Sequence, residues 1–137
     1  MESDRQWFDH VSNMHLSNLQ LNLETEKEGY VSSIGKKEEK YDVIVIDGRW
    51  RNACASVCVN HLIDSGMIVL DNSDRHPDIC QRFREMGFFQ IDFHGFGPVN
   101  GYAWSTTIFV KDPKGLQNNY YHSQVVGGLI QLSNDDD

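Results

Sequence analysis

Two apolar runs that each break off at an aspartate constrain this chain more than any other feature. The first reads YDVIVID, residues 41–47, and the second reads MIVLDN, residues 67–72. Neither run alternates polar with apolar residues, and strands without alternation are typical of parallel sheets whose two faces are both covered. We therefore expect the segments Asp42–Ile46 and Met67–Leu70 to be strands buried on both faces.

Helix and strand signals alternate around these two runs. Residues 52–64 carry apolar side chains at helical spacing, and residues 77–86 begin with a proline and end before a glycine. Residues 88–93 and 106–110 have strand composition and are joined by a Gly-rich connection. This order predicts an α/β fold with a mainly parallel sheet and a terminal antiparallel strand pair.

The two ends of the sequence are less regular. Residues 4–14 place their apolar side chains on one face, which predicts a short helix. Leucines at 19, 21 and 23 alternate with polar residues, which predicts a half-buried strand. We expect one domain over residues 1–112 and a C-terminal extension with an acidic tail over residues 113–137.

The composition excludes several classes of protein. A net charge of −8 argues against a nucleic-acid-binding surface, which needs a basic face. No apolar run approaches the roughly 20 residues of a membrane helix, and the polar start MESDRQWFDH is no secretory signal. Three cysteines, an odd number, fit a reducing compartment. We expect a cytoplasmic protein without nucleic-acid or membrane partners.

The residues at the two strand ends suggest a binding site. Asp47 ends the first run, and Asp71 and Asn72 end the second. Ligands of open parallel sheets lie beyond the carboxyl ends of the strands, where these side chains converge if the strands are neighbours. Two carboxylates and an amide oxygen suit Mg²⁺ or Ca²⁺. The alternative is that these residues only form turns or cap the following helices.

The segments YDVIVIDGRWR, GMIVLDNSDR and GFFQIDFHGFGPVNGYAWSTTIFV resemble a known family. They are similar to the second half of a class I S-adenosylmethionine-dependent methyltransferase, and the likeness covers about residues 2–111. The resemblance implies a partial Rossmann-like sheet whose last two strands form the family's closing antiparallel pair. It also implies a site like that of the cation-dependent O-methyltransferases, with Mg²⁺ held by Asp47, Asp71 and Asn72, and a small hydroxylated acceptor.

The resemblance further implies S-adenosylmethionine as cofactor, with Glu2 in the acidic position that holds its ribose hydroxyls. The family's Gly-rich cofactor loop has no counterpart in this sequence, so the chain is expected to begin where the family's second strand ends. Two hypotheses follow. One is a methyltransferase, or the acceptor-side portion of one. The alternative is a non-catalytic, truncated or split methyltransferase-like module that associates through an exposed sheet edge.

Three further residues are candidates for the site. His76 lies close to the second strand end and is a candidate general base. Arg49 and Arg51 are candidates for binding an anionic acceptor, the alternative being a solvated helix start.

The first apolar strand raises a separate expectation about partners. Without its usual neighbour in that family, segment Asp42–Asp47 is an apolar sheet edge. We expect it to be covered by the strand Leu19–Leu23, or by a second chain in a homodimer or with a partner protein.

Overall fold

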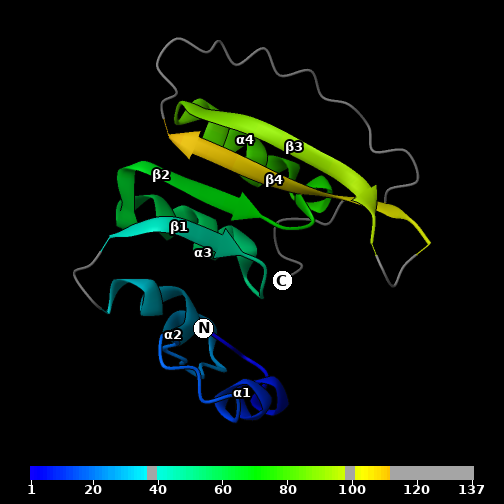
Figure 1. Cartoon of the computed structure of the whole chain (residues 1–137). Helices are drawn as coiled ribbons and strands as arrows, with labels where there is room; N and C mark the ends of the chain where they lie inside the picture. The colour runs from blue at the N-terminus through cyan, green and yellow to red at the C-terminus, as the bar shows by residue number, and fades with distance from the viewer. Residues whose placement is uncertain (37–39, 98–100, 112–137) are drawn as a thin grey trace.

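The computed structural model describes residues 1–36, 40–97 and 101–111 (Figure 1). The predicted extension 113–137 lies outside these residues. The elements in chain order are α1 (Arg5–Ser12), α2 (Lys27–Ser32), η1 (Ser33–Gly35), β1 (Tyr41–Ile46), α3 (Arg51–Cys58), η2 (Val59–His61), β2 (Leu62–Leu70), η3 (Ser73–Arg75), α4 (Pro77–Glu85), β3 (Phe88–Phe96) and β4 (Ala103–Lys111).

The four strands form one mixed sheet in the order β1-β2-β4-β3. β1 and β2 are parallel, with Ile44 opposite Ile68, whereas β4 runs antiparallel to both β2 and β3. The α/β class and the terminal antiparallel pair are confirmed, but the prediction of a mainly parallel sheet is wrong. The reason is that β4 follows β3 after a short connection, which forces an antiparallel pair, and then lies between β3 and β2.

The two longer helices of the central region cover one face of the sheet (Figure 1). One buried cluster joins the sheet to α3 and α4; it contains Ile44, Ile46, Ala55, Cys58, Leu62, Ile68, Leu70, Ile79, Cys80, Phe83, Phe88 and Phe109. The rings of Phe83 and Phe109 lie 4.9 Å apart between their centroids. The predicted helix 52–64 is wrong at its end, because β2 already begins at Leu62, which is fully buried in this cluster.

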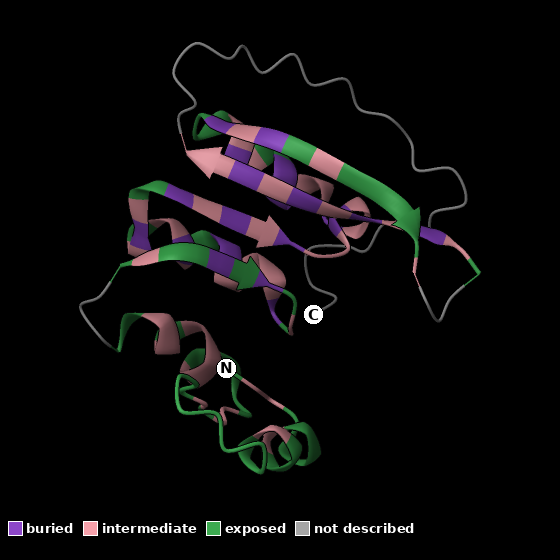
Figure 2. Cartoon of the chain, viewed as in Figure 1, coloured by how far each residue is buried: buried purple, intermediate pink, exposed green. Residues whose placement is uncertain are grey.

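The opposite face of the sheet, here called the open face, is apolar. Cross-strand register places on it Val43, Val45, Met67, Val69, Phe89, Ile91, Phe93, Thr106, Ile108 and Val110. Val43 is 47% exposed, Val45 63% and Phe93 55%, and exposed positions stand out on β1 and β3 in Figure 2. The prediction that the segment Asp42–Ile46 is buried on both faces is therefore wrong. Both connecting helices lie on the other side, and no helix of the described residues covers this one.

Residues 1–36, here called the N-terminal segment, contain no buried residue. Helix α1 is confirmed, with Asp4 as its N-cap accepting from the backbone N–H groups of Gln6 and Trp7. The predicted strand Leu19–Leu23 is wrong. Only Leu23 pairs, in an isolated parallel bridge with Glu2, and Leu19 remains exposed. Alternating leucines form a strand only where they pair with a sheet edge and bury one face. Among the described strands β1 pairs with β2 alone, so these leucines do not extend the sheet.

Candidate functional site

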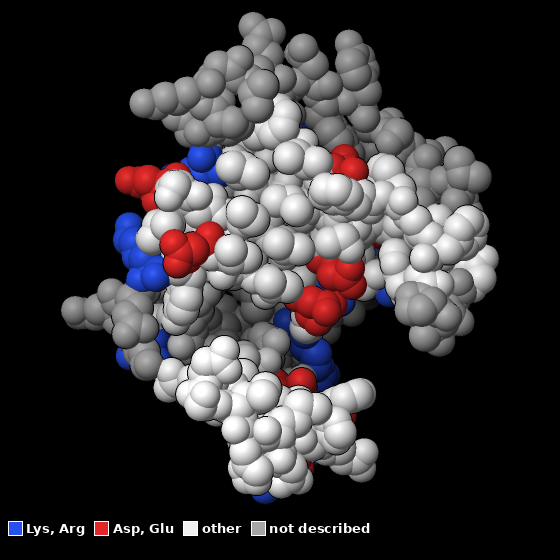
Figure 3. All heavy atoms as spheres, viewed as in Figure 1, with Lys and Arg blue, Asp and Glu red and all other residues white. Residues whose placement is uncertain are grey.

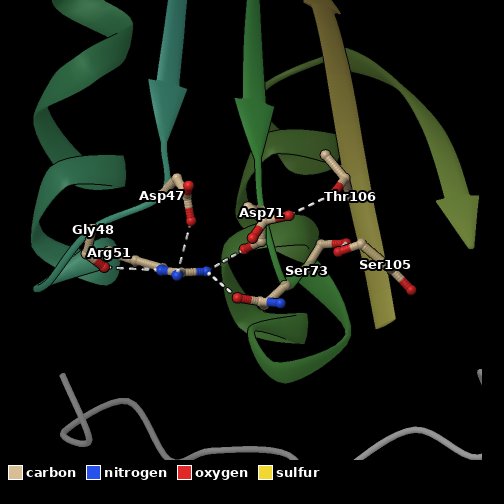
Figure 4. Close-up of polar contacts among 8 residues, drawn as sticks. Asp47, Gly48, Arg51, Asp71, Ser73, Ser105 and Thr106 are labelled. Carbon is tan, nitrogen blue, oxygen red and sulfur yellow. Dashed lines mark hydrogen bonds and ion pairs between the residues drawn. The ribbon is translucent and has the colours of Figure 1, made fainter. Parts of the chain in front are cut away.

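The carboxyl ends of β1 and β2 bring the predicted Mg²⁺ ligands together (Figure 4). Because these strands are parallel and Ile46 lies opposite Leu70, Asp47 and Asp71 leave the sheet at the same edge. The backbone N–H of Asp71 donates to the carbonyl of Ile46 over 3.1 Å, which extends the pairing by one residue. The side chains of Asp47 and Asp71 are close enough for the Asp71 charge to act on Asp47.

Arg51 lies between the two strand ends. Its Nε donates to the Gly48 carbonyl over 2.9 Å, and its Nη2 forms an ion pair with Asp47 Oδ1 at 3.3 Å. Its Nη1 donates to Asn72 Oδ1 over 3.2 Å and also to the backbone carbonyl of Asp71. The arginine side chain is only 14% exposed. Arg51 therefore fastens the β1 end to the β2 end.

A second set of hydrogen bonds fastens the β2 end to β4. Thr106 Oγ1 donates to Asp71 Oδ1 over 2.5 Å, and the backbone N–H of Ser105 donates to Asp74 Oδ1 over 2.9 Å. Ser73 Oγ donates to the Ser105 carbonyl over 3.2 Å, and Ser73 is buried. The turn after β2 is thus held to the middle of the sheet, and the position of Asp71 is fixed from two sides.

Both strand ends turn through left-handed backbone conformations. Asn72 has φ 50° and Trp50 has φ 53°. Asparagine adopts this region readily, but a bulky residue such as tryptophan does so at a free-energy cost. Trp50 is buried, with the Arg49 guanidinium 4.9 Å from its ring and the Tyr30 ring packed edge-on at 5.3 Å. These contacts hold the turn that delivers Arg51 to the site.

The electrostatics of the site raise two pKa values. Partial burial and the neighbouring Asp71 charge raise the pKa of Asp47, and Arg51 opposes this shift. Burial raises the pKa of Tyr30, with the charges of Cys54, Glu2 and Asp47 adding to the effect. A raised carboxyl pKa means that Asp47 holds its proton more tightly than an isolated aspartate does.

A cavity of about 370 Å³ adjoins the site. It lies between the N-terminal segment and the β1–α3 layer, and its walls include Tyr30, Ile34, Ile44, Ile46, Asp47 and Cys54. Its lining combines apolar and polar groups, and Asp47, Gly48 and Arg49 stand at the β1 end. The cavity therefore connects the Asp47 carboxylate with the space beside the outer edge of β1.

The predicted Mg²⁺ ligands converge, but one side-chain oxygen of each already accepts a hydrogen bond. Asp47 and Asn72 accept from Arg51, and Asp71 accepts from Thr106. A guanidinium at this position repels a second cation, so the arrangement does not fit a divalent ion. Among the described residues, no group of three or more His, Cys, Asp and Glu side chains is arranged to hold a metal.

The other predicted site residues lie in different settings. His76 is 4% exposed and precedes α4, so its side chain faces the protein interior. Arg49 is exposed and stacked on Trp50, whereas Arg51 is enclosed, so the two arginines lie in different environments. Glu2 Oε1 accepts from the backbone N–H groups of Ser3 and Asp4, at 2.7 and 2.8 Å. Their predicted roles stay predictions.

Two residues of this site were missed in the sequence. Thr106 lies thirty-five positions after Asp71, and no local pattern links residues so far apart. Tyr30 reaches the site from the N-terminal segment, where its hydroxyl lies against Gly48: a Cβ built on Gly48 would be 2.3 Å from the tyrosine oxygen. A glycine directly after a strand-end aspartate was the available signal for such a close approach.

The sequence matches no model of a known protein family, and no curated protein matches it either. Within the part of the chain that the structure describes, no helix is both long and apolar enough to span a membrane.

Proposed function

We propose that this chain is the acceptor-side portion of an S-adenosylmethionine-dependent methyltransferase domain that acts on a small hydroxylated acceptor. The main support is the carboxylate pair Asp47–Asp71, held at the carboxyl ends of two parallel strands. The antiparallel pair β3–β4 supports it further, because the resemblance expects such a pair to close the sheet. Open α/β sheets bind their ligands at strand ends of this kind.

Methylation of a hydroxyl oxygen needs a group that accepts the hydroxyl proton. Asp47 suits this role, since its side chain is 59% exposed and partial burial and the Asp71 charge raise its pKa, which makes it a stronger base than an isolated aspartate. His76, the general base predicted from the sequence, is enclosed by comparison. We therefore assign proton acceptance to Asp47, with Asp71 and Arg51 fixing its position.

The described residues offer the cofactor only part of a site. Glu2, the group expected to hold the ribose hydroxyls, already bonds to its own backbone turn through Oε1. We therefore expect the chain by itself to bind S-adenosylmethionine weakly or not at all. The three free cysteines fit the cytoplasmic location that we propose.

Amide NMR spectra of the full chain, titrated with catechol as a simple hydroxylated acceptor, test this proposal. We expect shifts of the signals of Gly48, Arg51 and Asn72, and loss of these shifts in Asp71→Asn. Asp64→Asn is the matched control, because Asp64 is an exposed carboxylate of β2 that forms an ion pair with Lys111, away from the strand ends. Catechol shifts that survive Asp71→Asn, or no shifts at the strand ends, would contradict the proposal.

A second candidate function, favoured by the open face, is a module that works only in association. The ten residues of the open face include no charged side chain, and uncharged atoms fill the middle of this face in Figure 3. An exposed apolar surface of this kind is typical of an interface. We propose a second copy of the chain as the occupant, because an uncharged face lets two chains of net charge −8 meet without opposing like charges.

Sedimentation velocity tests this association. The chain should sediment as a dimer, and Val45→Lys should convert it to a folded monomer, because a lysine charge would be buried in the interface. Trp7→Lys is the control: Trp7 is exposed on α1, away from the sheet, and should leave the dimer intact. A monomeric unmodified chain, or a dimeric Val45→Lys variant, would rule out the open face as a homodimer interface.

A further inference from the structure

We propose that Arg51 serves as the built-in cation of the strand-end site, so that the Asp47, Asp71 and Asn72 oxygens bind a neutral hydroxylated ligand and not a divalent metal. This inference concerns the site itself and holds whether or not the chain takes part in methyl transfer. It rests on the contacts of one enclosed guanidinium.

The first step is the number and direction of these contacts. The four hydrogen bonds of Arg51 reach the Gly48 carbonyl, the Asp71 carbonyl, Asn72 Oδ1 and Asp47 Oδ1. They use most of the guanidinium's N–H groups. Two of the acceptors belong to the residues expected to bind metal, and a third is the backbone carbonyl of the remaining one (Figure 4). The guanidinium thus lies between the Asp47 and Asn72 side-chain oxygens and the backbone carbonyl of Asp71, while Asp71 Oδ1 accepts from Thr106.

The second step is charge. The charge of Asp71 acts on Asp47, and two neighbouring carboxylates repel unless a proton or a cation neutralises them. Arg51 supplies a permanent positive charge here, because the guanidinium keeps its proton at every pH that a protein tolerates. Its side chain is 14% exposed, so water screens this charge less than it would at the surface. The carboxylate pair therefore has its counter-charge without a metal.

The third step is the origin of Arg51. It is the first residue of α3 and follows Asp47 by four positions, with the left-handed residue Trp50 between them. The turn that ends β1 therefore returns the side chain to its own strand end. The same short segment provides a carboxylate and its counter-ion, which makes the pairing independent of distant parts of the fold.

The chemistry left for a ligand follows from these three steps. Asp47 is the more exposed of the two aspartates. Its carboxylate can accept further hydrogen bonds beyond the single bond from Arg51. A carboxylate accepts hydrogen bonds, so it selects hydroxyl donors. An anionic ligand would meet the carboxylates before the enclosed guanidinium. The class of ligand is therefore a neutral alcohol or phenol.

Terbium luminescence and Mg²⁺ calorimetry on the full chain test this inference. The unmodified protein should show no saturable binding of either ion at the strand ends. Arg51→Ala removes the built-in cation and should create a saturable site, with an affinity at least about ten-fold above the detection limit at which the unmodified protein shows none, because the two carboxylates are then unneutralised. Adding Asp71→Asn to Arg51→Ala should abolish the new site again.

Two further variants keep the test decisive. Arg51→Gln loses the charge but keeps side-chain bulk, and it replaces Arg51→Ala if that variant does not fold by circular dichroism. Arg51→Lys keeps a positive charge and should gain no metal site. Saturable Mg²⁺ binding by the unmodified protein that Asp71→Asn removes would overturn the inference. So would a folded, uncharged variant at position 51 that still binds no ion.

Discussion

The contact between Thr106 and Asp71 allows one prediction to be worked out quantitatively. The Thr106 hydroxyl donates to Asp71 Oδ1 over 2.5 Å and joins β4 to the end of β2. Thr106→Val has nearly the same shape but no hydroxyl, so it removes this bond alone. Hydrogen bonds to charged groups contribute about 1.5–3 kcal/mol. Both partners are only partly buried and water can replace the donor, so we expect a loss of about 1–2 kcal/mol.

Urea unfolding followed by circular dichroism measures this loss. Thr106→Ser is the matched control, because it keeps the hydroxyl and should retain most of the bond. A double-mutant cycle with Asp71→Asn isolates the contact, and we expect a coupling energy of about 1 kcal/mol or more. A coupling below about 0.3 kcal/mol, within the error of additivity for independent sites, would refute the claim that this bond fixes the site.

Three further predictions follow from the same region and from the cysteines. The pKa of Asp47 is raised in the folded state, so the folded protein binds a proton there more tightly than the unfolded chain does. The Asp47 carboxyl therefore contributes its full stability below the ordinary aspartate pKa, and this contribution is lost as pH rises through the raised value. Asp47→Asn should remove this loss, so its stability relative to that of the unmodified protein, measured by thermal melts, should increase as pH rises through the acid range; a difference that does not change with pH would contradict this. Asn72→Ala should unfold more easily than Asn72→Gly by about 1 kcal/mol, because only glycine adopts the left-handed turn without strain; equal urea midpoints would contradict this. Burial raises the pKa of Cys58 and Cys80 to about 12, so iodoacetamide at about pH 8 should modify only Cys54 in the folded protein, as mass spectrometry would detect.

The elements that the sequence predicts well are those fixed by local chemistry. Pro77 at the start of α4, Gly87 after its end and Asp4 at the cap of α1 each mark a boundary. The convergence at the strand ends was also accessible, because two apolar runs joined by one short helix commonly form neighbouring parallel strands.

The features that the sequence did not reveal depend on distant partners. Val43 and Val45 have the composition of a doubly buried strand, and only the placement of both helices on one side leaves them exposed. The alternating leucines of residues 19–23 have strand character but meet no sheet edge. The role of Arg51 needed the positions of Asp71 and Asn72, twenty and twenty-one residues away. Tertiary context decided each of these outcomes.

The absence of any buried residue in the N-terminal segment divides the molecule by local stability. Regions with few buried contacts open without unfolding the rest, at free energies well below the global value. The amides of α1 and α2 should therefore exchange with deuterium fast, while those of β2 and β4, which lie inside the sheet around fully buried Ile68 and Phe109, exchange only on global unfolding. Tyr30 belongs to the fast-opening part, so opening of the N-terminal segment uncovers Gly48 and the cavity beside β1 while the sheet remains intact. Access to this cavity is thus governed by a local equilibrium that is separate from the stability of the sheet.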